Sequence, residues 1–499
     1  MKRFMAVDLG ASGGKSFLGT FNEDSFAFQE LHRFSHEGVT FFIPDAAGEV
    51  TRRMYWDDIF IYRNIVTGLY KFKREIGANL DSIGIDTWGA DGQFIAENGD
   101  LLGKVYCYRD HRLDTMVEVI KGKMDPRRIY DITGIHFQPF NLSNQLYWFK
   151  ENRESFFSLA ACFLPIPTLF YYWLGGITSV DSSWASVTQL MDAREKKWSS
   201  EIMDALGLPE NIMPRIVDPG TVMGEIHPEL ARKIGLKGVQ LTAVGSHDTA
   251  SAFAAAPVND YAESLIISSG TWSLVGKLVP EPVTTDEAYR YNLSNEGGIG
   301  NIRLLRNCMG TWLVQELRRV WRVQDGKEME WGELVSLAEK APPFTAFIDP
   351  DDSSFYNPEN MEEAIVSFCK RTKQKVPENR GGILRVVYES LALKYRWVNE
   401  LICKASGTET KVINVVGGGS RNTMLNQFTA DALGLPVVSG PDEATAVGNI
   451  MAQAFALGVI PSLKEAMPYV KSAFSIEEFK PQTAGGWREQ YERFLTICS

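Results

Sequence analysis

The residues best suited to chemistry lie in one turn, Gly245, Ser246, His247 and Asp248. Residues 239–244, just before it, form a short apolar strand pattern, and the Ala-rich residues 249–256 after it predict a buried helix. A strand, a turn and a helix in this order place the turn at the carboxyl edge of a sheet, where free backbone N–H groups point outward. The pattern therefore predicts an anionic ligand at this turn, with a histidine and an aspartate beside it.

Asp248 has two interpretations. As an N-cap, its carboxylate accepts N–H bonds from the first helical turn and stabilises the helix by about 1 kcal/mol. As a catalytic base, it accepts a proton from a substrate hydroxyl. Taken alone, the pattern favours the cap, so the catalytic interpretation depends on the rest of the chain.

A glycine-rich hairpin is expected near the start of the chain. Residues 4–7 are an apolar strand that leads into Asp8, residues 10–14 (GASGG) form a turn, and residues 16–21 resume a strand pattern. Such a turn lets backbone amides approach a phosphate closely, and Asp8 at the strand end can hold Mg²⁺ directly or through water. The alternative is an ordinary hairpin turn with an Asx residue.

The sequence Gly14-Lys15-Ser16 suggests a Walker A motif, but its spacing is wrong. Leu9 stands where the first glycine of that motif would be, and residues 17–21 have a strand pattern where a helix is required. Both observations exclude a P-loop.

A second hairpin of the same kind follows the midpoint of the chain. Residues 265–267 are an apolar strand, residues 268–271 (SSGT) a small polar turn, and residues 272–278 another strand. Two such strand-turn-strand units predict an internal repeat, in which two related α/β domains face each other over a nucleotide.

A run of glycines, Gly417, Gly418 and Gly419, follows a strand pattern at residues 411–416 and precedes a helical pattern at 424–433. Glycines lack Cβ atoms, so a flat adenine or a ribose can pack on this backbone, or the run simply connects the strand to the helix. Residues 444–457 then form an apolar helix rich in small residues, suited to packing between domains.

Composition limits the classes of protein. The chain has 499 residues, 44% of them hydrophobic, which suggests two or three domains, and its net charge of −11 argues against nucleic acid or an anionic membrane as a partner. We expect no signal peptide, because Asp8 interrupts the N-terminal apolar residues. The cysteines are scattered without a CxxC pair, which indicates a cytoplasmic protein with reduced thiols.

Several motifs together resemble the FGGY carbohydrate kinase family, in the branch that phosphorylates L-rhamnulose. They keep the family's order from residue 8 to about residue 449, and they are DLGASGGK (8–15), DTWGAD (86–91), YRDHR (108–112), GIHFQPFN (134–141), SHDTAS (246–251), SSGTWSL (268–274), NEGG (295–298), RNCMG (306–310) and VGGGSRN (416–422).

The resemblance implies two ribonuclease H-like α/β domains of the actin and hexokinase type, closing on ATP and a sugar. The domains are expected at 1–257, with the first phosphate loop and the base, and at 258–499, with most nucleotide contacts. It implies transfer of the γ-phosphoryl group of Mg-ATP to the 1-hydroxyl of L-rhamnulose by a monomer or small homo-oligomer.

The same resemblance assigns roles to individual residues. Asp248 is implied as the catalytic base, with sugar contacts from Gly89, His247, Asp248, Thr249 and Asn307. The implied nucleotide-binding residues are Ala11, Ser12, Gly13, Gly14, Lys15, Thr271, Gln315, Gly417, Gly418 and Gly419.

The first phosphate loop departs from the family pattern. That pattern has a second Ser followed by Gly-Arg, whereas this chain has Gly13 and then Gly14-Lys15. Lysine keeps the charge but lacks the planar fork of arginine. We therefore expect the role to survive with an altered affinity for ATP.

Further residues near these motifs have open alternatives. The aromatic residues Trp88, Phe137 and Phe140 can line the methyl end of a deoxysugar or belong to the core. Asp86 and Asp91 can accept hydrogen bonds from sugar hydroxyls, or they can end a strand and a turn. The charged cluster of Arg109, Asp110 and Arg112 can be solvated surface or functional.

Two other functions remain open at this stage. One is a kinase of another ketose or polyol, such as L-fuculose or a pentulose, on the same fold. The other is an actin-like ATPase or a sugar sensor without turnover, against which Asp248 and its neighbours argue.

Overall fold

The computed structural model describes residues 1–22, 25–44, 46–482 and 486–498. Its contacts divide the chain into two compact units, each a mixture of helices and strands. Unit 1 comprises Met1–Ala255, Leu278–Leu304 and Ala444–Ala473, and unit 2 comprises Ala256–Lys277, Leu305–Glu443 and Phe474–Ser499.

The sheet of unit 1 has the strand order β13-β14-β6-β1-β2-β3. Its strands are β1 (Lys2–Gly10), β2 (Gly13–Phe21), β3 (Phe26–Ser35), β6 (Ser82–Thr87), β13 (Val222–Glu225) and β14 (Gln240–Thr242). β1, β6 and β14 run parallel, whereas β2 pairs antiparallel with both β1 and β3. The predicted strands at the N-terminus are confirmed, and their hairpin closes with Gly10 opposite Gly13.

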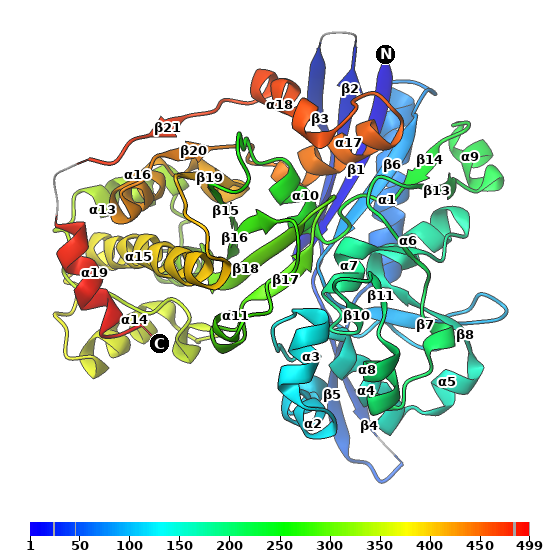
Figure 1. The fold of residues 1–499 in the computed structure, drawn as a ribbon, viewed down its shortest axis with the longest axis horizontal. Coiled ribbons are helices and arrows are strands. Elements are labelled where there is room, and N and C mark those ends of the chain that lie inside the picture. Colours follow the sequence, from blue (N-terminus) through cyan, green and yellow to red (C-terminus); the bar gives the residue numbers. More distant parts are fainter. Residues whose placement is uncertain (23–24, 45, 483–485, 499) are drawn as a thin grey trace. The chain divides into compact units, whose positions relative to one another are not determined.

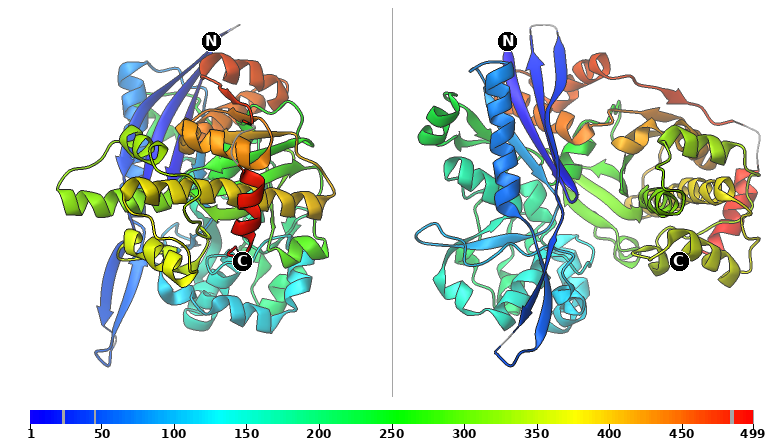
Figure 2. Two further views of the ribbon diagram at one scale, coloured as in Figure 1. Left: turned by 90° about the vertical axis from the view of Figure 1, so that its left-hand side faces the viewer. Right: turned by 180° about the vertical axis from the view of Figure 1, so that it is seen from behind.

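Helices cover both faces of this sheet. α1 (Asp58–Glu75) lies on one face and α17 (Ala444–Ala456) on the other, as Figure 1 and the reverse view in Figure 2 show. Apolar side chains of β1, β6 and α1, such as Met5, Ile83 and Ile65, are fully buried between them. The sequence pattern at residues 444–457 predicted α17.

The other helices of unit 1 are mostly short. They are α2 (Met116–Lys123), α3 (Pro126–Thr133), α4 (Leu142–Asn152), α5 (Ser155–Leu159), α6 (Ile166–Gly175), α7 (Ser182–Ser186), α8 (Ser200–Leu206), α9 (Pro228–Ile234), α10 (Asp248–Ala254), α11 (Asp286–Arg290) and α18 (Met467–Ala473). Short additional strands are β7 (Gly92–Ala96), β8 (Ala160–Pro165), β9 (Val180–Asp181), β10 (Met191–Asp192), β11 (Lys197–Trp198), β12 (Ile216–Val217) and β17 (Ser294–Gly297).

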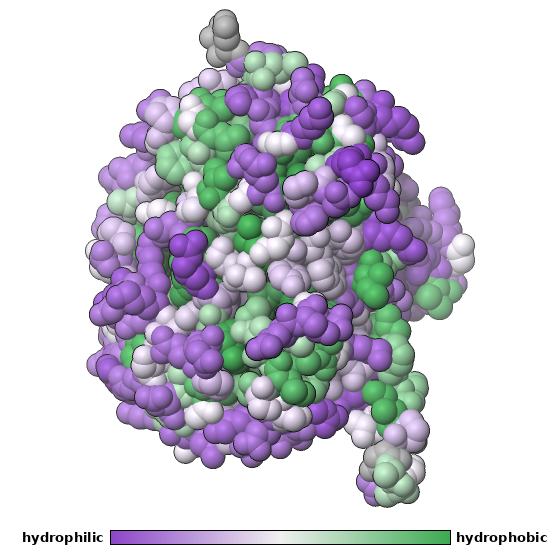
Figure 3. Space-filling view, turned by 90° about the vertical axis from the view of Figure 1, so that its right-hand side faces the viewer, coloured by the Kyte–Doolittle hydropathy of each residue, from purple (hydrophilic) through white to green (hydrophobic). Residues whose placement is uncertain are grey.

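A hairpin of β4 (Val39–Pro44) and β5 (Val50–Tyr55) projects from unit 1. Its apolar side chains are unusually open to solvent, with Phe42 71% and Val50 62% exposed. Figure 3 shows hydrophobic residues along this arm.

The sheet of unit 2 repeats the pattern of unit 1. The strand order of this sheet is β17-β18-β16-β15-β19-β20-β21, in which β17 is the edge strand named above, and β15 is antiparallel to β16 and parallel to β19. Its other strands are β15 (Ser264–Ser269), β16 (Trp272–Val279), β18 (Ile302–Met309), β19 (Val412–Val416), β20 (Val437–Ser439) and β21 (Glu478–Phe479). β15, β16 and β19 thus occupy the positions that β1, β2 and β6 have in unit 1, which confirms the predicted repeat.

Long helices pack around this second sheet. They are α12 (Trp312–Asp325), α13 (Trp331–Glu339), α14 (Met361–Arg371), α15 (Arg380–Ser406), α16 (Thr423–Leu433) and α19 (Trp487–Leu495). α13 and α16 both pack against α15 (Figure 1). Among the described residues, no helix is both long and apolar enough to cross a bilayer.

The compact units are discontinuous in sequence, unlike the contiguous domains 1–257 and 258–499 expected above. Residues 444–473 belong to unit 1 because α17 packs against β1, β6 and α10. A β-carbon at Gly448 would overlap the carbonyl oxygen of Ser251, so this packing requires glycine at the contact. The division near residue 257 stays a prediction.

Candidate active site

The β1–β2 hairpin places Ala11 and Ser12 in its turn, between the paired residues Gly10 and Gly13. Gly13 is tightly enclosed, since a β-carbon there would lie 2.8 Å from the carbonyl oxygen of Phe34. Lys15 lies within β2, opposite Asp8 on β1. The sequence Gly14-Lys15-Ser16 is therefore strand, which confirms that it is not a P-loop.

Asp8 lies at the carboxyl end of β1, where it is aligned with Asp86 on β6. Asp86 is completely buried, and its carboxylate accepts hydrogen bonds from Ser251 Oγ at 2.7 Å and from Asn449 Nδ2 at 2.5 Å. Burial raises the pKa of Asp86 well above its ordinary value, and Asp8 and Asp248 add to the effect. Asp86 thus joins β6 to α10 and α17, and both oxygens of its carboxyl group accept hydrogen bonds in these contacts.

A divalent ion bound with a nucleotide takes much of its coordination from phosphate and water, so one or two protein carboxylates suffice. Among the described residues, no three or more His, Cys, Asp or Glu side chains cluster as a metal site. Asp8 fits the smaller requirement, because it is partly exposed and stands at the end of the strand that enters the glycine-rich turn.

Asp248 is the first residue of α10 and follows a β14–α10 connection, as predicted. Its interpretation as the N-cap is wrong by one residue, because His247 occupies the cap position. Asp248 Oδ1 accepts the backbone N–H of Thr249 at 2.6 Å, and the side chain remains 27% exposed.

The surroundings of Asp248 favour proton acceptance. Burial raises the pKa of its carboxyl group above the ordinary value, although His247, the Thr249 N–H and Arg303 oppose the shift. A raised pKa makes the carboxylate a better base than a free aspartate.

Gly89 and Thr249 lie around the imidazole of His247. The Thr87 N–H donates to the carbonyl of Ser246 at 2.8 Å, which joins the end of β6 to the turn before α10. A β-carbon at Gly89 would lie 2.8 Å from His247 Nε2, so only glycine lets the ring sit there. Thr249 Oγ1 lies 3.3 Å from the same Nε2. The structure thus brings together the sugar-contact residues predicted in unit 1.

Sequence analysis missed two residues that complete this cluster, Glu296 and Arg303. Arg303 Nη1 donates to Thr249 Oγ1 at 2.5 Å, and Nη2 lies 3.1 Å from His247 Nδ1. Glu296 Oε2 lies 3.2 Å from Arg303 Nη2. Glu296 belongs to a motif that was recognised without a role, whereas no local signal marked Arg303.

The aromatic residue Trp88 is part of the core. Only 6% of it is exposed, and Trp88 Nε1 donates to Asp91 Oδ2 at 3.0 Å. Trp56 Nε1 donates to the same oxygen at 2.7 Å, so Asp91 anchors two indoles. Phe137 and Phe140 are only partly buried, which agrees both with a place at the edge of the core and with a contact to the sugar.

The charged cluster at residues 109–112 is largely internal. Asp110 and Arg112 are buried, whereas Arg109 and His111 are exposed. The guanidinium of Arg112 lies 4.2 Å from the ring centre of Tyr106, and its Nη2 donates to Gln145 at 2.9 Å. Its interpretation as solvated surface is therefore wrong for Asp110 and Arg112, which hold the core together.

The predicted nucleotide residues of unit 2 gather around the β15–β16 hairpin. Thr271 Oγ1 in its turn donates to Gln315 Oε1 at 3.3 Å. Gly417 has φ of +81°, and a β-carbon there would lie 3.0 Å from the carbonyl oxygen of Ser269. A β-carbon at Gly419 would overlap Ser269 Oγ, so the glycine run lies directly against the hairpin. Gly418 has open space beside it.

Asn307 lies in β18 and has a feature expected of a ligand contact. Its Oδ1 is buried and has no hydrogen-bond partner among the described residues. An unsatisfied buried acceptor is costly unless a ligand or water completes it.

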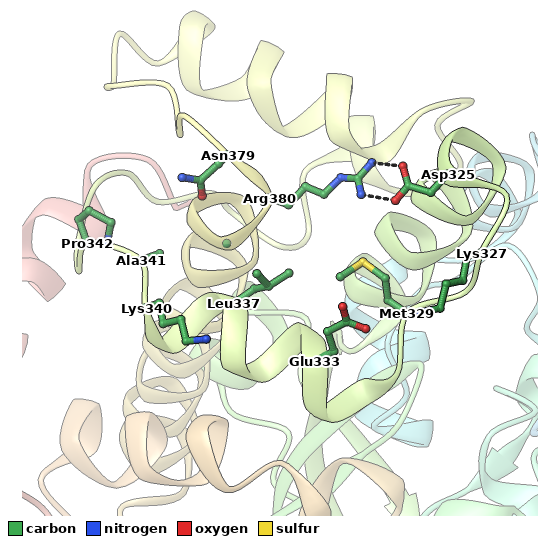
Figure 4. A pocket seen from close by; sticks show the side chains of 11 residues that line it. Asp325, Lys327, Met329, Glu333, Leu337, Lys340, Ala341, Pro342, Asn379 and Arg380 are labelled. Atoms are coloured by element: carbon green, nitrogen blue, oxygen red, sulfur yellow. Dashed lines mark hydrogen bonds and ion pairs between the residues drawn. The ribbon is translucent and has the colours of Figure 1, made fainter.

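A separate pocket in unit 2 has a volume of about 700 Å³ and lies between the ends of α12, α13 and α15 (Figure 4). Arg380 and Asp325 pair at its edge, with Nη2 and Oδ1 2.9 Å apart. None of the predicted sugar or nucleotide residues lines it. The size of this pocket therefore says nothing about the site of phosphoryl transfer.

Comparisons with known proteins show the family of the chain. The model of the FGGY family of carbohydrate kinases, N-terminal domain, matches residues 67–254, and that of the C-terminal domain matches residues 265–457. A protein of Bacteroides thetaiotaomicron named rhamnulokinase is 38% identical over 99% of this chain and 99% of its own length. Rhamnulokinase of Enterococcus faecalis is 35% identical over 100% of this chain and 98% of its own length.

Solved structures support the fold. Gluconate kinase from Lactobacillus acidophilus has a TM-score of 0.80 at 17% identity, covering 99% of this chain and 97% of that one. Plasmodium falciparum glycerol kinase with ADP has a TM-score of 0.78 at 15% identity, covering 100% of this chain and 97% of that one. Because both domain models match and the relatives are similar to this chain over nearly their full length, the chain belongs to the FGGY family of carbohydrate kinases.

Proposed function

We propose that the chain is an ATP-dependent kinase that phosphorylates the 1-hydroxyl of L-rhamnulose, giving L-rhamnulose 1-phosphate and ADP. The choice of sugar rests on the relatives named rhamnulokinase, which match nearly the whole chain. The chemistry rests on one observation, the partly exposed carboxylate of Asp248, which has a raised pKa and lies among His247, Thr249 and Gly89.

In the proposed reaction, the oxygen of the sugar 1-hydroxyl forms a bond to the γ-phosphorus of ATP. The bond from that phosphorus to the β,γ-bridging oxygen breaks, and ADP leaves with the electron pair. Asp248 orients the hydroxyl and takes its proton as the new bond forms. Because phosphoryl transfer needs alignment and charge stabilisation more than covalent help, positioning supplies most of the catalysis.

The other predicted residues have supporting roles. His247, Thr249, Gly89 and the unsatisfied Oδ1 of Asn307 would bind sugar hydroxyls. The nucleotide would be held by the backbone of both hairpins and by a set of residues expected from the resemblance: Ala11, Ser12, Gly13, Gly14, Lys15, Thr271, Gln315, Gly417, Gly418 and Gly419.

Sugar kinases of this family use ATP, generally with a divalent metal ion. We propose Mg²⁺ as that ion and Asp8 as its carboxylate. When bound, the ion would neutralise charge on the transferring phosphates. We also place the enzyme in the cytoplasm, because its scattered cysteines suit a reducing compartment.

The test is ADP release in a coupled assay with Mg-ATP and a panel of ketoses and polyols, with a control lacking sugar. We expect kcat/KM for L-rhamnulose to exceed that for L-fuculose, ribulose and xylulose, and ³¹P-coupled NMR of the product to place the phosphate on carbon 1. A higher kcat/KM for another ketose would overturn the sugar assignment. Equal ADP release without any sugar would indicate an ATPase, and no release with any member would remove the kinase assignment.

A further inference from the structure

A buried arginine lies behind the residues that flank Asp248. The side chain of Arg303 is completely buried, yet each of its nitrogens faces a different acceptor. Nε donates to the carbonyl of Gly297 at 3.0 Å, Nη1 donates to Thr249 Oγ1 at 2.5 Å, and Nη2 lies 3.1 Å from His247 Nδ1. A planar fork of donors can satisfy three acceptors in fixed directions, and a lysine ammonium cannot reproduce that geometry.

Glu296 supplies the charge that makes this buried arginine acceptable. It is 2% exposed, and its Oε2 lies 3.2 Å from Arg303 Nη2 and 3.3 Å from His247 Nδ1. Burial alone would raise the pKa of Glu296, but the interactions led by the charge of Arg303 outweigh burial and lower it to about 2. The carboxylate therefore stays ionised at neutral pH, and the pair carries no net charge.

The strand that carries Glu296 is itself fixed. In β17, the N–H of Gly297 donates to Ser186 Oγ at 2.7 Å, and a β-carbon at Gly297 would lie 2.8 Å from the carbonyl oxygen of Ser182. Asn295 Nδ2 donates to the carbonyl of Val283 at 2.9 Å. Because β17 has little freedom to shift, the direction in which Arg303 presents its donors is also fixed.

These contacts determine how His247 and Thr249 meet a substrate. Two groups compete for His247 Nδ1: the Glu296 carboxylate at 3.3 Å can only accept there, whereas Arg303 Nη2, which is closer at 3.1 Å, can only donate. When Arg303 donates, Nδ1 is an acceptor and the ring proton is on Nε2. Nε2 is the nitrogen beside Gly89 and lies 3.6 Å from Asp248 Oδ1. His247 then offers a hydrogen-bond donor next to the carboxylate, where a sugar hydroxyl oxygen would lie.

We propose that Arg303, held by Glu296, is a positioning residue that fixes the orientation of Thr249 and the tautomer of His247 for sugar binding beside Asp248. The inference deepens the proposed function and rests on it. It also gives the Asn295–Gly298 motif a role, because β17 carries the Gly297 carbonyl and the Glu296 carboxylate that hold Arg303 in place.

A buried ion pair can also be merely structural, and its removal often costs stability. The Arg303→Lys variant separates the two roles, because it keeps the charge and loses the fork. We expect kcat/KM for L-rhamnulose to fall by about 10²-fold, the usual effect of misplacing contact groups by about 1 Å. KM for ATP should stay within about twofold, because no contact of Arg303 involves a predicted nucleotide residue.

The Thr249→Val variant completes a double-mutant cycle. If Arg303 acts through Thr249, the double variant should lose much less kcat/KM than the product of the two single losses. The matched control is Arg127→Lys, since Arg127 Nη2 also donates to a backbone carbonyl of unit 1, that of Thr284 at 2.9 Å, and in the described part of the chain its contacts include no site residue. Independent losses, or a rise in both KM values together with a fall in thermal stability, would overturn the positioning role.

One measurement needs neither turnover nor a variant of Arg303. ¹⁵N NMR of the histidine-labelled parent enzyme, with His247 assigned by its absence in His247→Asn, should show Nδ1 unprotonated and the proton on Nε2. A proton on Nδ1 would overturn the proposal even if the enzyme phosphorylates L-rhamnulose. If the parent turns over no sugar, the proposed function fails, while the NMR result still decides the role of Arg303.

Discussion

Replacing Asp248 with asparagine should separate proton acceptance from folding. Asp248 Oδ1 accepts the Thr249 N–H at 2.6 Å, and an asparagine can keep that bond through its own Oδ1. The change therefore preserves the shape at the start of α10. What it removes is the negative charge and the capacity to take a proton from a hydroxyl.

The magnitude follows from the two roles of the carboxylate. Loss of a general base typically lowers turnover by about 10²- to 10⁴-fold, or roughly 3 to 5 kcal/mol in the barrier. The free energy of unfolding of Asp248→Asn, in contrast, should not fall below that of the parent. The raised pKa of Asp248 means that its stabilising contribution is present below the unfolded-state pKa and is lost as pH rises through the folded-state pKa. At pH 7.5 the ionised side chain opposes folding, so Asp248→Asn should melt at the same temperature as the parent or higher.

The assay pairs sugar-dependent ADP release with thermal unfolding at pH 7.5, and calorimetry measures binding of L-rhamnulose. We expect kcat to fall at least 10²-fold while the sugar still binds. Asp125→Asn is the matched control, because Asp125 accepts the Arg127 N–H at the start of α3 and asparagine caps a helix equally well. Turnover within a few-fold of the parent would refute the role of Asp248, and a loss of turnover matched by a lower melting temperature would assign the residue to folding.

Other variants test the surroundings of the site. Gly448→Ala should destabilise unit 1 by about 1–3 kcal/mol in urea unfolding and lower activity, because its β-carbon would overlap the Ser251 carbonyl and displace α10; unchanged stability would contradict this packing. Asp8→Asn should raise the Mg²⁺ concentration for half-maximal activity by roughly tenfold, and an unchanged Mg²⁺ titration would exclude Asp8 as a metal ligand. Burial raises the pKa of Glu389 to about 7, against the pull of Arg385, so its stabilising contribution fades as pH rises from 4.5 through 7. The free energy of unfolding of Glu389→Gln, relative to that of the parent, should therefore rise by up to about 3 kcal/mol between pH 5 and pH 8. The difference between their melting temperatures should change in the same direction, and a constant difference would refute the shift.

Local sequence patterns predicted the strands and turns of the site well. The Gly10 to Gly14 turn and the SSGT turn after β15 could be read directly, because glycine and small polar residues between apolar strands have few other structures. The start of α10 was displaced by one residue, since His247 supplies no side-chain cap and only the backbone geometry marks the boundary. Periodicity thus located most elements to within two residues, whereas the ends of β1 and β2 at the hairpin, expected at residues 7 and 16, lie at residues 10 and 13.

Contacts between distant segments were beyond such patterns. Arg303 lies 54 residues from Thr249 in sequence, and neither residue has a local feature that indicates the other. Arg112 carries the charge of a surface residue, yet its contacts with Tyr106 and Gln145 bury it. A charged side chain is buried only where the fold brings it into contact with partners from distant segments, and local patterns in one sequence do not show which segments come into contact.

Aspartates 8, 86 and 248 show how environment, more than position, divides the chemistry at one edge of the sheet of unit 1. Asp86 is completely buried and bonded to Ser251 and Asn449, so it has no oxygen free to face a sugar without breaking the contacts that hold α10 and α17. Asp8, in register with it, is partly exposed beside the glycine-rich turn, where its carboxylate would be open to the phosphate-bound cation proposed above. Substituting Asp86 should therefore lower activity together with stability, whereas substituting Asp248 should lower activity alone. Residues of the same type at neighbouring strand ends thus take different roles according to their burial and their partners.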